Sequence, residues 1–86
     1  MTLLNISDII RKENYIYYRR EFTATVVFQL GTGNLSGKIE FTIETAPTGK
    51  KDIQIKLIDS IDYPLLPLLR SIKDAVTELE KEGKLP

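Results

Sequence analysis

The densest set of chemically active side chains is the segment Tyr15-Ile16-Tyr17-Tyr18-Arg19-Arg20. Its tyrosine rings could stack on bases and its guanidinium groups could hold phosphates, which is the chemistry of single-stranded nucleic-acid binding. Tyrosines in a strand also serve cross-strand packing, and a pair of arginines also occurs at solvated strand ends. The packing interpretation is favoured, because Glu40 and Glu44 are predicted on the open sheet face, where their carboxylates would repel phosphate.

Most catalytic constellations are excluded by composition. The chain has no Cys and no His, which excludes a thiolate nucleophile, an imidazole base, a disulfide and a soft-metal site. The segment Gly31-Thr32-Gly33 is neither followed by a Lys-Ser/Thr pair nor placed before a predicted helix, so it indicates a turn and not a phosphate loop. We therefore expect no enzymatic activity, no metal and no cofactor.

Length and charge bound the remaining classes. With 86 residues the chain has room for one domain, residues 1–86. Twelve basic and twelve acidic residues give a net charge of zero, so no overall field steers the chain to nucleic acid or anionic lipid. No apolar run approaches the ~18 residues that a membrane helix needs, and the first ten residues lack the pattern of a secretory signal. We expect no membrane partner and a cytoplasmic location.

The first half of the chain predicts a short helix and then strands. Leu3, Ile6, Ile9 and Ile10 have near-helical spacing, which predicts one or two helical turns between Thr2 and Lys12. Residues 15–30 are rich in β-branched and aromatic residues and alternate in polarity from Phe22 onward, which predicts one strand or two. A bulge or turn is expected at Arg19-Arg20-Glu21.

Two turns then join three alternating segments. Gly31-Thr32-Gly33-Asn34 predicts a β-hairpin that leads into a strand over 38–45. Pro47-Thr48-Gly49-Lys50 predicts a second turn, followed by a strand over 52–59. These segments predict an antiparallel β-meander.

The last third of the chain has the period of a helix. One stripe contains Leu65, Leu68, Leu69, Ile72, Val76 and Leu79. Pro64 and Pro67 are expected in the first turn, and Gly83 as the left-handed C-cap. The predicted fold class is α+β: an antiparallel β-meander of three or four strands with a C-terminal α-helix packed on one face.

This order of elements, over Tyr15 to Leu79, resembles the repeat unit of the PUR and PC4 families. The resemblance implies a unit that works in pairs and binds single-stranded nucleic acid.

A small open sheet has bare edges that invite pairing with another chain. Our leading hypothesis is therefore a small non-enzymatic protein-interaction module that forms a homodimer. Val27, on the polar sheet face, and Leu66, off the helical stripe, are the predicted partner contacts. The alternative is a single-stranded nucleic-acid-binding domain, whose contacts would be Tyr15, Tyr17, Tyr18, Arg19 and Arg20.

Overall fold

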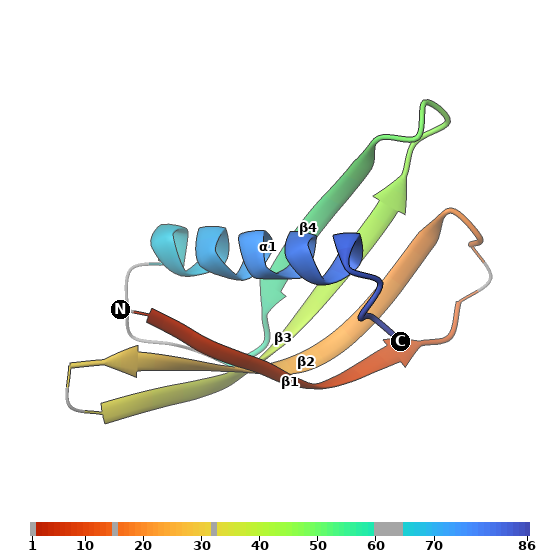
Figure 1. Ribbon diagram of the computed structural model, residues 1–86. Helices are drawn as coiled ribbons and strands as arrows, with labels where there is room; N and C mark the ends of the chain where they lie inside the picture. Colours follow the sequence, from red (N-terminus) through yellow and green to blue (C-terminus); the bar gives the residue numbers. More distant parts are fainter. Residues whose placement is uncertain (1, 15, 32, 60–64) are drawn as a thin grey trace.

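A computed structural model describes residues 2–14, 16–31, 33–59 and 65–86. In these residues the chain forms four antiparallel strands in the order β1-β2-β3-β4 and then one helix (Figure 1). The elements are β1 (Thr2–Lys12), β2 (Arg19–Leu30), β3 (Gly33–Thr45), β4 (Lys51–Leu57) and α1 (Leu65–Lys81). The predicted α+β class, with its meander and C-terminal helix, is confirmed.

The first segment is a strand, so the expected N-terminal helical turns are wrong. Strand β1 pairs with β2, and its register shifts between Leu3 and Asn5 and again between Ser7 and Ile10. Each shift adds one residue, which returns the next apolar side chain to the same face. Leu3, Ile6 and Ile9 consequently all pack against the core. Two bulges in a strand have produced the three-residue spacing that was interpreted as helical.

The segment 15–30 contains one described strand, which begins at Arg19. Its pairing with β3 runs without a shift from Arg19 opposite Glu44 to Leu30 opposite Gly33. The chain turns just before the strand, where the Arg19 amide donates to the Ile16 carbonyl at 3.1 Å. The bulge or turn expected within Arg19-Arg20-Glu21 is therefore displaced to the residues that precede it.

Both predicted turns between strands are confirmed. Gly31 has a φ of 55° and Gly49 a φ of 88°, a backbone region that glycine adopts without steric cost. In the second turn the Gly49 amide donates to the Ala46 carbonyl, and the Ala46 amide donates to the Lys50 carbonyl, each at 2.8 Å. These bonds fix the register of β3 against β4.

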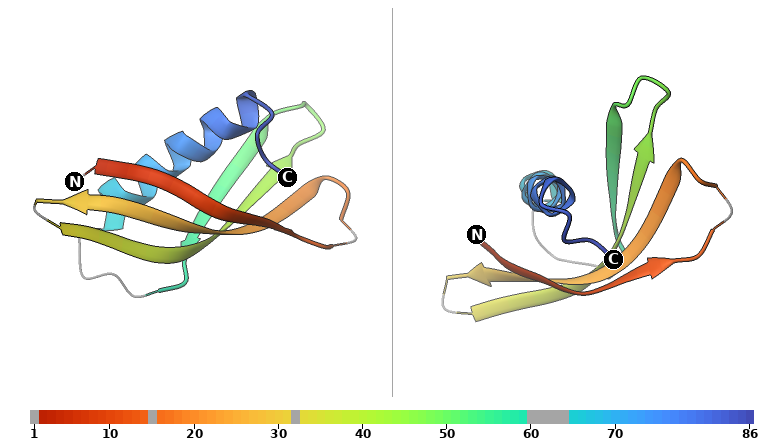
Figure 2. Two further views of the ribbon diagram at one scale, coloured as in Figure 1. Left: turned by 60° about the horizontal axis from the view of Figure 1, so that its bottom comes forward. Right: turned by 45° about the vertical axis from the view of Figure 1, so that its right-hand side comes forward.

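The hydrophobic core lies between one face of the sheet and α1. The right-hand view of Figure 2 looks nearly along the helix and shows it on the concave side of the curved sheet. Phe22 and Phe41 stack with ring centroids 4.8 Å apart. The buried apolar side chains are Phe22, Ala24, Val26, Phe28, Ile39, Phe41, Ile43, Ile53, Leu68, Ile72 and Val76. The predicted helical stripe is thus confirmed at its three buried members.

The ends of α1 follow the sequence signals where they are described. Pro67 is the third helical residue, where its missing amide hydrogen costs nothing. After the helix Gly83 has a φ of 68°. The Gly83 amide donates to Glu80 and the Lys84 amide to Leu79, at 3.2 and 3.0 Å, which is a Schellman cap. Pro64 lies outside the described residues. Within the described chain, no helix is long and apolar enough to cross a membrane.

Candidate functional site

The two described tyrosines of the predicted site lie in the loop between β1 and β2. Tyr17 is 97% exposed and Tyr18 is half exposed. Their rings meet edge to face, with centroids 5.7 Å apart and planes at 88°. Tyr15 lies outside the described residues. The packing interpretation does not hold for Tyr17, because a side chain so exposed is not buried between strands.

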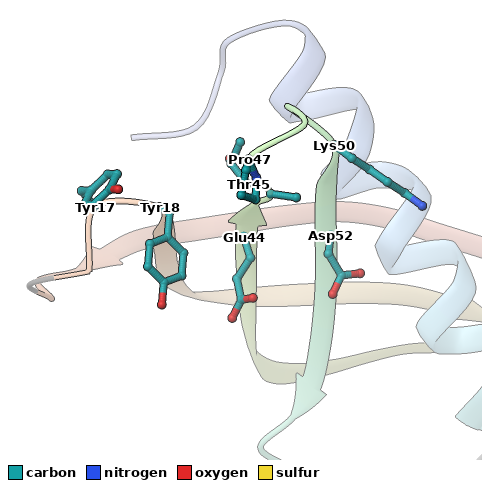
Figure 3. Close-up of a pocket in the computed structure, with 8 residues that line it drawn as sticks. Tyr17, Tyr18, Glu44, Thr45, Pro47, Lys50 and Asp52 are labelled. Atoms are coloured by element: carbon teal, nitrogen blue, oxygen red, sulfur yellow. The ribbon is translucent and has the colours of Figure 1, made fainter.

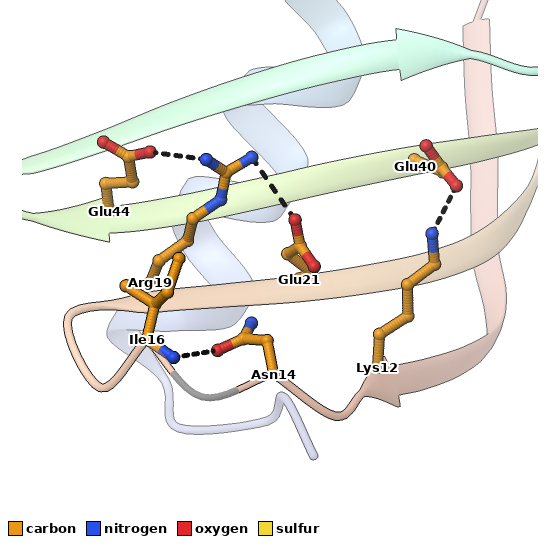
Figure 4. A network of polar contacts seen from close by, with 7 residues as sticks. All are labelled: Lys12, Asn14, Ile16, Arg19, Glu21, Glu40 and Glu44. Carbon is orange, nitrogen blue, oxygen red and sulfur yellow. Dashed lines mark hydrogen bonds and ion pairs between the residues drawn. The ribbon is translucent and has the colours of Figure 1, made fainter.

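Arg19 points to the open face of the sheet, away from α1, and is held there by carboxylates. Its Nη1 lies 3.2 Å from Glu44 Oε1, and its Nη2 lies 3.3 Å from Glu21 Oε1 (Figure 4). Its Nε is buried and has no hydrogen-bond partner among the described residues. The guanidinium group is therefore engaged within the sheet surface.

Arg20 points to the opposite face, the one that α1 covers. Its Nη2 donates to Glu80 Oε1 at 2.7 Å, and Lys51 Nζ donates to the same oxygen. The hydrogen bond from Arg20, with a further one from Lys51, lowers the pKa of Glu80 against the opposing effect of burial. This cluster fastens the last turn of α1 to β2 and β4.

The two arginines therefore do not form one cationic surface. They are neighbours in a strand, so their side chains point to opposite faces. Each is paired with at least one carboxylate. The structure does not bring Tyr17, Tyr18, Arg19 and Arg20 together as a site for a phosphate backbone.

The open face is polar and internally paired, as the sequence predicted for Glu40 and Glu44. Lys12 forms an ion pair with Glu40, and its hydrogen bond and charge lower the pKa of that carboxyl. Val27 lies on this face, opposite Asn5 on one side and Ser36 on the other. Leu66 is 76% exposed on α1, which covers the other face. The two predicted contact residues therefore lie on different faces and cannot share one contact.

A cleft opens where the β1–β2 loop meets the turn between β3 and β4 (Figure 3). Its volume is about 950 Å³. The Thr45 amide donates to the Tyr18 carbonyl at 2.9 Å, so the loop is fixed against the end of β3. We call this the tyrosine cleft; it is lined by Tyr17, Tyr18, Glu44, Thr45, Ala46, Pro47, Lys50 and Asp52.

The chemistry of the tyrosine cleft is aromatic and acidic. Glu44 and Asp52 are directly opposite in the β3–β4 register, and Figure 3 shows their carboxylates pointing the same way as the Tyr18 ring. The Lys50 side chain extends away from the tyrosines in the same view. Among the described residues, no group of three or more Asp or Glu side chains is placed to hold a metal ion. The cleft is suited to contact and charge recognition.

Sequence reasoning found Tyr17 and Tyr18 but missed the acidic half of the cleft. The missing signal was available: the turn at 47–50 sets the hairpin register, and that register places Glu44 opposite Asp52. What the sequence does not show is the docking of the β1–β2 loop onto Thr45, which joins the Tyr18 carbonyl to a residue in a different hairpin.

A family model supports the chain as a whole. The model of the Bb0187 family matches residues 1–81, so the chain belongs to that family. No curated protein and no solved structure matches it. The functional inference accordingly rests on the chemistry of the cleft and of the sheet faces.

Proposed function

We propose that this member of the family is a small, non-enzymatic protein-interaction module that binds its partner through the tyrosine cleft. The observation that carries the proposal is Tyr17, an aromatic side chain that is 97% exposed at the rim of a cavity. Tyrosines are enriched at the cores of protein interfaces, because they combine a large apolar surface with a hydroxyl group.

The cleft also has the shape and the backing of a peptide site. Tyr18, Ala46 and Pro47 supply apolar surface beside Tyr17. Backbone hydrogen bonds hold both the loop and the turn that form the walls, so little ordering entropy is lost on binding. Aromatic side chains that line a groove are a recurring means by which small domains hold extended peptides.

Self-association is part of the same proposal. Strand β4 pairs with β3 only from Ile39 to Thr45, so the outer edge of 33–37 extends beyond β4. An exposed edge of this kind can add a strand from a second copy. Leu66, 76% exposed on α1, offers a separate apolar contact. We also keep cytoplasmic residence as part of this proposal.

The nucleic-acid alternative is not favoured by a specific observation. Its arginines face opposite ways and are bound to carboxylates. Its exposed tyrosine rings stand beside Glu44 and Asp52, whose charges oppose a phosphate backbone.

The test is a selection of random peptides on the immobilised full chain. Peptides that bind at the cleft should lose at least about tenfold in affinity to a Tyr17→Ala variant, the scale of an interface hot spot. Leu66→Ala is the matched control, because it also removes an exposed apolar side chain but lies outside the cleft. Failure to select peptides, or peptides that bind the Tyr17→Ala variant as well as the wild type, would refute this function.

A further inference from the structure

We propose that the tyrosine cleft binds an arginine side chain of the partner; this inference rests on the proposed function of the same site. It is carried by a juxtaposition in the structure. Two tyrosine rings at right angles line the same cavity as two carboxylates from neighbouring strands.

The charge of the cleft favours a cation. Glu44 and Asp52 are directly opposite each other, an arrangement in which like charges repel. Arg19 lies 3.2 Å from Glu44 but is shared with Glu21. Within the described residues the hydrogen bond to Asp52 comes from the neutral amide of Gln54, at 3.3 Å. A bound cation would relieve a repulsion that the free protein retains.

The aromatic side of the cleft favours a guanidinium group over an ammonium group. A guanidinium plane can stack on one tyrosine ring and still direct N–H groups in its own plane toward a carboxylate. An ammonium group is more strongly hydrated and cannot make this flat contact. The Tyr17 side chain is open to solvent over almost its whole surface, so its ring is accessible for stacking.

The probe is the blocked tripeptide acetyl-Gly-Arg-Gly-amide, titrated into the full chain and followed by nuclear magnetic resonance. Its neutral counterpart carries citrulline, which has the shape of arginine without the charge, and a third peptide carries lysine. We expect saturable shifts at Tyr17, Tyr18 and Asp52 with the arginine peptide. Binding should be several-fold weaker with lysine and not measurable with citrulline.

Matched charge variants locate the effect. Asp52→Asn should weaken binding of the arginine peptide by about five- to tenfold, the scale of one exposed charge-assisted contact. Asp74→Asn makes the same change in net charge at an exposed position on α1 and should leave binding unchanged. Raising the salt concentration should weaken binding to the wild type more than binding to the Asp52→Asn variant.

The outcomes separate this inference from the proposed function. Equal binding of the arginine and citrulline peptides, equal binding of the lysine peptide, or equal effects of the two Asn variants would overturn the arginine assignment. If selected peptides depend on Tyr17 but contain no arginine, the arginine assignment is wrong and the interaction function stands. If the arginine tripeptide binds at the cleft but no selected peptide depends on Tyr17, the interaction function is wrong.

Discussion

Replacing Ile72 with Ala should remove a large part of the stability of this domain. The Ile72 side chain is fully buried in the middle of α1. Its truncation loses the transfer free energy of the removed groups and leaves a cavity, a combined cost of about 2–5 kcal/mol. At roughly 0.05–0.15 kcal/mol per residue, a chain of this length has a total stability of about 4–13 kcal/mol. A loss of about 3 kcal/mol corresponds to a fall in Tm of roughly 12–24 °C for a domain of this size.

The assay is urea unfolding followed by circular dichroism, at one low protein concentration so that self-association does not contribute. Leu66→Ala is the control on the same helix, because its side chain is 76% exposed. It should cost less than about 0.5 kcal/mol, and Leu69→Ala, which is partly buried, should fall between the two. Equal losses for Ile72→Ala and Leu66→Ala would show that the buried face of α1 has been misassigned.

Three further predictions concern charge, assembly and the alternative function. The pKa of Glu80 is lowered in the folded state, so its pairing stabilises the fold above the unfolded-state pKa of the carboxyl and is lost as pH falls through the folded-state pKa. Glu80→Gln should therefore flatten the acid side of the stability curve in thermal melts, and parallel curves would contradict this. If the chain self-associates, its Tm should rise with protein concentration and Leu66→Ala should reduce that rise; sedimentation as a monomer at high concentration would remove the hypothesis. Labelled single-stranded oligonucleotides should show no appreciable binding at moderate salt, and tight binding whose salt dependence falls in an Arg19→Ala/Arg20→Ala variant would revive the nucleic-acid hypothesis.

The predictable parts of the fold are those in which one periodicity runs without interruption. Phe22, Ala24, Val26 and Phe28 alternate in the sequence and are all buried on one face. The helical stripe is likewise regular, and the glycines of the turns occupy the left-handed conformations that their positions suggested. In these segments local chemistry and tertiary packing agree, so sequence reasoning succeeds.

Strand β1 shows how the same reasoning fails. A bulge changes the phase of a strand, and two bulges separated by a few residues turn a period of two into one of three. Nothing in the residues Leu3 to Ile10 distinguishes that pattern from a short amphipathic helix. The distinction is made by β2, whose unpaired edge needs a partner strand, and this information lies outside the segment.

The candidate site adds a second reason why proximity in sequence misleads. Arg19 and Arg20 are adjacent in the chain, yet the alternation of a strand sends one to Glu44 on the open face and the other to Glu80 beneath the helix. Glu44 and Asp52 are separated in the chain, yet the hairpin places them directly opposite. A functional surface on a sheet is therefore defined by register and face. For this chain those two quantities divide the apparent basic cluster and assemble an acidic, aromatic cleft in its place.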